Sequence, residues 1–427
     1  MALFMSVDRV RVLVARVRER LWVKPLVFCV LSIVAVVVAR AADDTVLVRI
    51  VPDTTRESLE TLLSIMASSM LVIATFSVGS MVSAYNAASN SATPRSFGVV
   101  VADDVSQNAL STFVGAFIFS IVAIMAVKND AFRPAGLGVL FALTALVFGL
   151  VVFTFVRWVD RIARLGRMGS TIEKVERATA EALARRRLAP TLGGVPVRPL
   201  PRGEAVTASQ VGYVQHIDMA RLQAWATAAG ARVVVAALPG TFAFPDRVLA
   251  YVSLPPGSEQ ALAADEVAAA FAIGRDRRFE DDPRFGLVVL SEIAGRALSP
   301  AVNDPGTAVQ VVGVLVRLLA QWAAPAAGAD TAPRCDRVEV PELSMRDMFD
   351  DAFTAIARDG AGTLEVAIRL QKALRALAGL GGPAMRAAAE DHARLALERA
   401  THTLALPADL ALVRAAAAVA AAARHDD

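Results

Sequence analysis

Residues 61–94 read TLLSIMASSMLVIATFSVGSMVSAYNAASNSATP, a stretch without Asp, Glu, Lys or Arg but with many Ser, Thr and Asn residues. Its small and polar residues recur at intervals of three, four or seven, which places them on one helix face within roughly 100°. At about 1.5 Å per residue the helix is about 50 Å long, more than a bilayer core requires. We therefore expect a membrane helix that extends beyond the lipid. Its uncharged polar face consists of Thr61, Ser64, Ser68, Thr75, Gly79, Ser83, Asn86 and Asn90.

This polar face has two interpretations. Small residues let two helices approach closely, and hydroxyls can bond to carbonyls of their own helix, so the face can be a packing surface. It can also line a wet path, which Asn86 and Asn90 favour slightly because unsatisfied amides are costly in lipid. Both interpretations stay open, since the sequence does not show where the helix leaves the lipid.

Three other segments have the length and apolar character of membrane spans. We expect four spans in all, at about Val23–Val38, Leu62–Ser83, Leu110–Val127 and Leu137–Val156. The arm before the first span and the segment after the fourth are rich in arginine, for example Arg16 and Arg161. By the positive-inside rule, both termini are expected in the cytoplasm of a bacterial cell, with the protein in its inner membrane.

The composition limits the class of protein. The chain has 427 residues, of which 55% are hydrophobic and 20% charged, and its mean hydropathy is +0.50. These values fit a membrane domain joined to a soluble domain. The net charge of +3 gives no reason to expect a nucleic-acid partner. Two cysteines and four scattered histidines predict neither a disulfide framework nor a metal site.

The second half of the chain predicts a soluble α+β region. Pro190–Pro201 is a Pro/Gly linker, and strand patterns follow between Thr207 and Leu254. Helical patterns then run to the end, with a loop at Ala323–Pro341. The expected helices are Ala261–Ile273, Pro283–Leu298, Pro305–Trp322, Met345–Ala357, Thr363–Leu380, Pro383–Leu404 and Pro407–Arg424.

The expected fold is thus that of a mainly α membrane protein with a cytoplasmic α+β region. We expect a basic cytoplasmic arm (1–22), a four-helix transmembrane domain (23–157) and a connecting helix (158–188). A linker (189–206), a small β-rich unit (207–256) and a helical cytoplasmic domain (257–427) follow.

Two soluble segments stand out as candidate ligand sites. Residues 274–286 alternate arginines with carboxylates, including Arg275, Arg278 and Arg284. Arginine forks match phosphate oxygens, but neighbouring carboxylates can neutralise them, so an ion-pair network is the favoured interpretation.

The second segment runs from Arg296 to Thr307. Ser299-Pro300 interrupts one helix, and Asn303 or Asp304 can cap the next, with Pro305 in its first turn. A sharp corner between two helices is favoured over an anion site at the free amides.

No catalytic or cofactor motif is present in the sequence: it has no nucleophile elbow, P-loop, dinucleotide fingerprint or zinc-protease motif. We therefore do not expect an enzyme, a cofactor or a resident metal. His216 and Asp218, close together on an expected strand, are interpreted as ordinary polar residues.

Several strings together resemble a known family. They are Ser91-Ala-Thr-Pro-Arg95, Leu110-Ser-Thr-Phe-Val-Gly-Ala-Phe117, Gly212-Tyr-Val-Gln-His-Ile-Asp218, Pro239-Gly-Thr-Phe242, Arg278-Phe-Glu-Asp-Asp-Pro-Arg-Phe-Gly286 and Ala297-Leu-Ser-Pro-Ala-Val-Asn-Asp-Pro305. Over nearly its whole length the chain resembles bacterial predicted membrane proteins known as domain of unknown function 2254. The resemblance implies four N-terminal spans and a cytoplasmic domain, and it implies no activity. The Ser- and Asn-rich second span departs from the apolar run expected there.

Two functions follow as hypotheses. The first is a channel or pore for small ions. It is expected to be homo-oligomeric, because four spans in one copy are few to enclose a path. Its path would be lined by Thr61, Ser64, Ser68, Thr75, Ser83, Asn86 and Asn90. The second is a membrane-anchored sensor or scaffold whose cytoplasmic domain binds a partner or a small anion. Its candidate residues are Arg275, Arg278, Arg284, Arg296, Ser299, Asn303 and Asp304.

Overall fold

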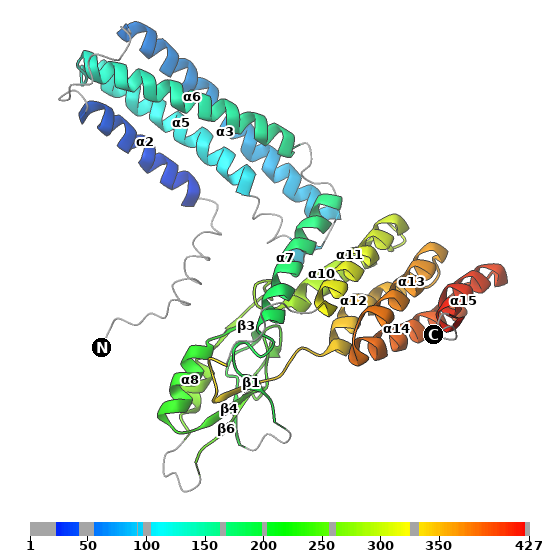
Figure 1. Cartoon of the computed structure of the whole chain (residues 1–427). Coiled ribbons are helices and arrows are strands. Elements are labelled where there is room, and N and C mark those ends of the chain that lie inside the picture. Colours follow the sequence, from blue (N-terminus) through cyan, green and yellow to red (C-terminus); the bar gives the residue numbers. More distant parts are fainter. Residues whose placement is uncertain are drawn as a thin grey trace. The chain divides into compact units, whose positions relative to one another are not determined.

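The computed structural model describes residues 23–41, 55–91, 93–96, 104–162, 168–198, 203–255, 262–324 and 333–422. The chain forms two compact units, residues 1–171 and 172–427. The elements of both units are labelled in Figure 1. The basic arm expected at residues 1–22 lies outside the described residues, as do most of the arginines used to predict orientation.

In the described residues of the first unit there are four long helices: α2 (Val23–Ala41), α3 (Arg56–Ser91), α5 (Asp104–Lys128) and α6 (Pro134–Ile162). Helix α5 is central and packs against the other three. Helix α2 approaches it closely at Gly115, whose carbonyl accepts a hydrogen bond of 2.8 Å from Ser32 Oγ. The absence of a side chain at Gly115 permits this approach, because a Cβ there would lie 3.0 Å from the Cβ of Phe28.

The surface of this unit is apolar where a soluble bundle would be polar. Large side chains exposed on its outside include Leu31, Val72, Phe76, Leu146 and Phe153. Such a surface is costly in water and is typical of helices that face lipid. Helices α3, α5 and α6 are long and apolar enough to cross a membrane, and α2 contains a shorter apolar helix, Pro25–Ala41. The four apolar N-terminal helices predicted from the sequence are confirmed.

Helix α11 (Pro305–Ala323) also meets the length and composition of a membrane span. It lies in the second unit, where its apolar face is buried and packs against neighbouring helices. Its Arg317 forms a bidentate ion pair with Glu176, at 2.8 and 3.0 Å. We therefore place α11 in the helical part of the second unit.

The β-rich part of the second unit contains two sheets. A five-stranded sheet has the order β1-β8-β4-β6-β2, and a three-stranded antiparallel sheet has the order β5-β3-β7. Helix α8 (Met219–Ala228) packs on the larger sheet. The strands are β1 (Val195–Pro196), β2 (Glu204–Thr207), β3 (Gly212–Ile217), β4 (Arg232–Val235), β5 (Phe242–Ala243), β6 (Val248–Ser253), β7 (Phe271–Gly274) and β8 (Val338–Val340).

The helix predicted at Ala261–Ile273 is wrong over most of its length. A short helix, α9 (Ala264–Ala268), is followed by β7, which pairs with β3. Tertiary pairing here overrides the helical propensity of an Ala-rich segment. Strand β8 likewise lies within the predicted loop, and β1 lies within the predicted linker; the two strands pair in parallel. Both are very short, so period-2 patterning cannot reveal them.

Six helices form two rows in the remainder of the unit. Helices α10 (Pro283–Ala297), α12 (Met345–Asp359) and α14 (Pro383–Thr403) pack in one row. Helices α11, α13 (Leu364–Leu380) and α15 (Pro407–Ala422) pack in the other, as Figure 1 shows. Five of the seven helices predicted in this half are confirmed within a few residues, and the seventh, α15, is described to Ala422.

Helix α7 (Met168–Leu188) is tied to the second unit at several points. Arg185 donates to the carbonyl of Glu280 at 2.8 Å, and Arg187 donates to the carbonyl of Gln321. Near its middle, Thr179 lies against Gly286 of α10. From Ile172 onward, α7 therefore belongs to the second unit.

Candidate functional site

The polar stripe of α3 lies on the outside of the first unit. Thr61, Ser64, Ser68, Thr75, Ser83 and Asn86 are all exposed, while the side chain of Asn90 lies outside the described residues. Three of the hydroxyls donate back along the helix at 2.9 Å: Thr61 to Glu57, Ser68 to Ser64 and Thr75 to Leu71. The buried face of α3 carries apolar residues instead, such as Leu63 and Met70. Within one copy, none of the described residues packs over the exposed part of the stripe.

In the second unit, the charged segment at residues 275–286 forms an ion-pair network. Arg277 makes a bidentate pair with Asp282, with Nε to Oδ2 at 2.7 Å and Nη2 to Oδ1 at 3.1 Å. Its guanidinium also lies over the ring of Phe285, 5.2 Å from the centroid. These contacts fix the guanidinium at both its edge and its face.

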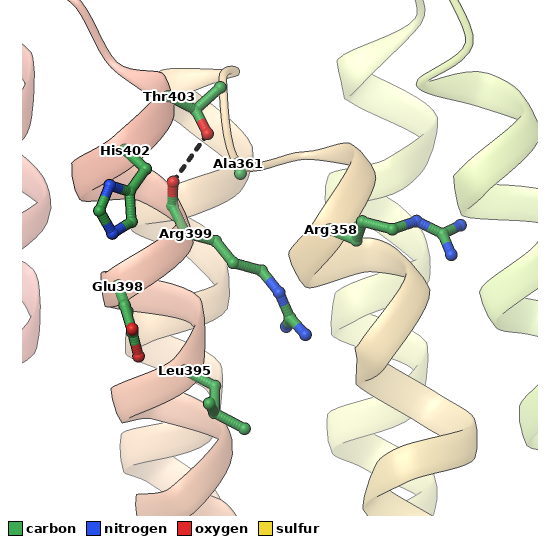
Figure 2. Close-up of a pocket in the computed structure, with 7 residues that line it drawn as sticks. All are labelled: Arg358, Ala361, Leu395, Glu398, Arg399, His402 and Thr403. Atoms are coloured by element: carbon green, nitrogen blue, oxygen red, sulfur yellow. Dashed lines mark hydrogen bonds between the residues drawn. The ribbon is translucent and has the colours of Figure 1, made fainter.

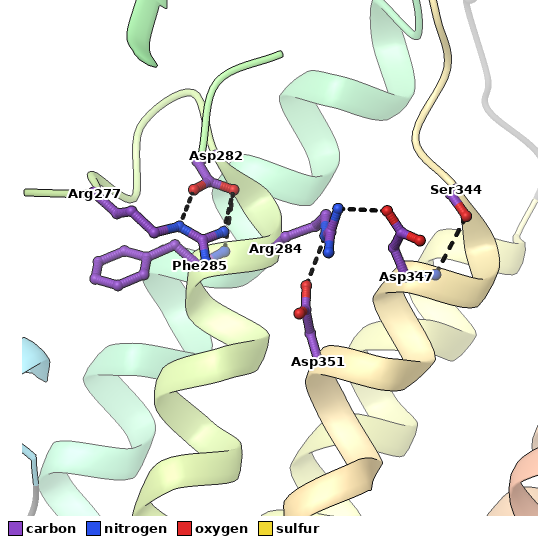
Figure 3. Close-up of polar contacts among 7 residues, drawn as sticks. All are labelled: Arg277, Asp282, Arg284, Phe285, Ser344, Asp347 and Asp351. Atoms are coloured by element: carbon purple, nitrogen blue, oxygen red, sulfur yellow. Dashed lines mark hydrogen bonds and ion pairs between the residues drawn. The ribbon is translucent and has the colours of Figure 1, made fainter. Parts of the chain in front are cut away.

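Arg284 takes its partners from another helix. Its Nε donates to Asp351 at 2.6 Å and its Nη1 to Asp347 at 2.7 Å, which joins α10 to α12 (Figure 3). Burial lowers the pKa of Arg284, but the hydrogen bond and charge of Asp351 and the charge of Asp347 outweigh it and raise the pKa. Within the described part of the chain, the expected ion pairing inside the segment is found for Arg277, whereas Arg284 pairs with carboxylates of α12. Arg275 and Arg278 take no part in these contacts.

Asp282 links the network to the Pro239-Gly240-Thr241-Phe242 turn. It caps α10, accepting a bond of 3.2 Å from the amide of Phe285, and is almost completely buried. Burial raises the pKa of Asp282, against the opposing effect of Arg277. Gly240 has a φ of +93°, and a Cβ there would overlap the Asp282 carboxylate. Only glycine fits this position without a shift.

A cavity of about 240 Å³ lies where these elements meet, and we call it the arginine pocket. Its two lining arginines, Arg277 and Arg284, and its lining carboxylate, Asp347, appear in Figure 3. The lining residues are Ala236, Leu238, Pro239, Gly240, Thr241, Arg277, Arg284, Pro341, Leu343 and Asp347. Helices α10 and α12 both begin next to it, with Asp282 and Ser344 as their capping residues.

The segment from Arg296 to Thr307 is a corner between α10 and α11. Asp304 caps α11: its Oδ1 accepts from the amide of Thr307 at 3.0 Å and its Oδ2 from the hydroxyl at 2.6 Å. These bonds lower the pKa of Asp304. Asn303 adopts the left-handed conformation, with φ of +48°, and Ser299 Oγ donates to the carbonyl of Arg296 at 2.7 Å. The predicted cap and corner are confirmed, with Asp304 as the capping residue.

The structure does not bring the two predicted soluble sites together. Arg284 lies in the first turn of α10 and Arg296 in its last turn. The predicted site residues did not include Gly240, Arg277, Asp282, Asp347 and Asp351, although the charged segment contained Arg277 and Asp282 as possible ion-pair partners. Two signals were available: Asp282-Pro283 repeats the Asp304-Pro305 capping pattern, and Ser344 precedes Asp347 by three residues.

A second, open cavity of about 440 Å³ lies between the ends of α12 and α14 (Figure 2). It is lined by Arg358, Ala361, Leu395, Glu398, Arg399, His402 and Thr403. Arg358 is already paired with Asp359 at 2.7 Å. Among the described residues, no group of three or more His, Cys, Asp or Glu side chains is placed to hold a metal ion.

A known protein family matches most of the chain, including both units. A family described as "Predicted membrane protein (DUF2254)" has a model that matches residues 18–376, which include α2 to α6, the arginine pocket and the corner. The chain belongs to the DUF2254 family. Four apolar helices followed by an α+β unit is thus the architecture of a DUF2254 membrane protein.

This DUF2254 protein also matches curated relatives from two mycobacteria. Uncharacterized proteins of Mycobacterium tuberculosis (MT1328) and Mycobacterium bovis (Mb1321c) are each 29% identical to it over 231 residues. The match covers 52% of this chain and 44% of each relative, so it spans less than half the length of the relatives. No solved structure matches the chain.

Proposed function

We propose that this DUF2254 protein is a homo-oligomeric ion channel or pore of the bacterial inner membrane, with both termini in the cytoplasm. In this proposal α3 of each copy lines the path, and the second unit assembles or gates it. The observation that carries the proposal is the exposed, uncharged polar stripe of α3 on an otherwise apolar surface.

The packing of one copy supports a path between copies rather than through one. Large buried side chains, among them Phe113, Phe119, Leu140 and Trp158, fill the first unit. The hydroxyls of Thr61, Ser68 and Thr75 already donate to their own helix, so their oxygen lone pairs remain for water or cations. An uncharged path of this kind gives weak charge selectivity by itself.

Single-channel recording in a planar bilayer tests the proposal. Wild-type protein is expected to give discrete current steps, and the double variant Ser68→Leu/Thr75→Leu is expected to abolish them. Val152→Leu and Phe153→Leu, at exposed positions of α6, serve as matched controls and should leave the current unchanged. Silent bilayers with inserted oligomeric protein, or a monomeric mass in detergent, contradict the channel.

A second candidate function is a membrane-anchored sensor or scaffold. The two helical rows favour it, because stacked helices expose extended surfaces suited to partner binding. Here the stripe would mediate contact between copies. The Leu substitutions at Ser68 and Thr75 would then change the oligomeric mass, with no current in either protein.

A further inference from the structure

We propose that the arginine pocket binds a small zwitterion, namely a free α-amino acid with an apolar side chain. Its carboxylate would bind the guanidinium groups of Arg277 and Arg284, and its ammonium group would bind Asp347.

Unused donors are the first observation. A guanidinium has five N–H donors. Arg277 commits Nε and Nη2 to Asp282, and Arg284 commits Nε to Asp351 and Nη1 to Asp347. Within the described part of the chain, Nη1 of Arg277 and Nη2 of Arg284 therefore donate to no protein group. Both arginines line the pocket and are partly exposed, which suits them to hold an oxyanion.

An unused acceptor in the same pocket is the second observation. Asp347 accepts from Arg284 with Oδ2 and leaves Oδ1 without a protein donor among the described residues. Its side chain is 46% exposed, whereas that of Asp351 is 18% exposed and does not line the pocket. Asp347 thus offers a carboxylate oxygen to a cationic group of a ligand.

The charges favour a ligand without net charge. Arg277 and Arg284 are paired with the carboxylates of Asp282, Asp347 and Asp351, and the buried Arg186 also interacts with Asp282. These ionised groups are largely balanced among themselves, so a phosphate or a free carboxylate would add a charge that none of them is left to balance. A zwitterion brings no net charge and matches both the unused donors and the unused acceptor.

Size and shape restrict the ligand further. The cavity of about 240 Å³ is smaller than the roughly 300–1,000 Å³ typical of drug-sized ligands, so it suits a molecule of amino-acid size. Leu238, Pro239, Pro341 and Leu343 form an apolar wall for the ligand side chain. The ion pairs and the Phe285 contact fix Arg277 before binding, which reduces the entropic cost of association.

Calorimetric titration of the detergent-solubilised full-length protein tests the proposal. Leucine, valine and the other apolar amino acids are compared with 4-methylpentanoate, which lacks the ammonium group of leucine, and with isoamylamine, which lacks its carboxylate. Binding of an amino acid but of neither half-molecule is expected. Binding of inorganic phosphate or of the carboxylate alone, or no binding of any amino acid at millimolar concentration, overturns the proposal.

Asp347 and Asp351 provide a matched pair of variants. Asp347→Asn should weaken amino-acid binding by about tenfold or more, while Asp351→Asn removes a similar ion pair from Arg284 and should keep most of the affinity. Equal loss in both overturns the role of Asp347. If either variant fails to fold, Ala236→Leu fills the pocket with its charges intact and should abolish binding.

Binding is measured here without any current, so its failure and the failure of the channel are separate results. If an amino acid binds, it would be the ligand of the membrane-anchored sensor proposed as the second candidate function.

Discussion

Gly240 and Asp282 are in direct contact beside the arginine pocket: the aspartate carboxylate occupies the space that a Cβ on residue 240 would need. The contact joins the turn after β4 to the cap of α10, and it places Asp282 where Arg277 can reach it. The turn at Gly240, the side chain of Arg277 and the first turn of α10 therefore all contact one buried carboxylate, that of Asp282.

Gly240→Ala should lower the free energy of unfolding by about 2 kcal/mol or more, because it adds both a clash and a left-handed alanine. Chemical denaturation of the purified protein measures the change. Gly379→Ala in α13 is the matched control: nothing lies within 4 Å of a Cβ there, so alanine should be neutral or stabilising. Equal behaviour of the two variants would refute the contact.

Gly286→Ala should also destabilise the protein, because a Cβ on α10 would overlap Thr179 of α7. Thr179→Ala removes the overlapping hydroxyl and methyl groups and should restore part of the loss in the double variant. A double-mutant cycle in denaturant reports the coupling, which should be about 1 kcal/mol or more. Additive effects would show that the two helices do not meet at this point.

We expect the buried imidazole of His392 to make the folded protein less stable in mild acid. His392 is buried beside Phe349 and Phe353, its Nε2 lies 3.0 Å from Asp350, and its Nδ1 has no hydrogen-bond partner among the described residues. Burial lowers the pKa of His392, and Asp350 opposes this only in part. Because the unfolded chain binds the proton more readily, stability should fall as pH drops below about 6.5, the ordinary histidine value.

Thermal unfolding as a function of pH measures this effect. His392→Gln should flatten the acid side of the profile, while His402→Gln, at an exposed position of the same helix, should leave it unchanged. If the His392→Gln variant still loses thermal stability in mild acid to the same extent, another group causes the loss.

Asp304→Ala should cost about 1 kcal/mol, the usual value for a lost helix cap, since Thr307 would lose both of its bonds. Asn303→Gly should be neutral, because glycine accepts the positive φ of that position. The same denaturation assay separates the two, and a neutral Asp304→Ala would show that another group can cap α11.

Features that depend on local sequence were predicted from it. The apolar helices, the polar stripe of α3 and the cap at Asp304 each follow from spacing within a few residues. Features that depend on distant segments were not. Strand β7 forms in an Ala-rich segment because β3 pairs with it, and Arg284 finds Asp351 on a helix 67 residues later. Neither pairing can be predicted from the few residues around one of its partners.

The attachment of α7 to the second unit bears on how the protein can be divided for expression. A fragment cut at the Pro/Gly linker near Pro190 would discard Glu176, Thr179 and Arg185. It would uncover the surfaces of α11 and α10 that Glu176 and Thr179 contact, and the carbonyl of Glu280 that Arg185 binds. A fragment that begins near Met168 keeps these contacts within one polypeptide. The natural place to cut this chain is therefore before the charged helix, some twenty residues ahead of its most obvious proline-rich break.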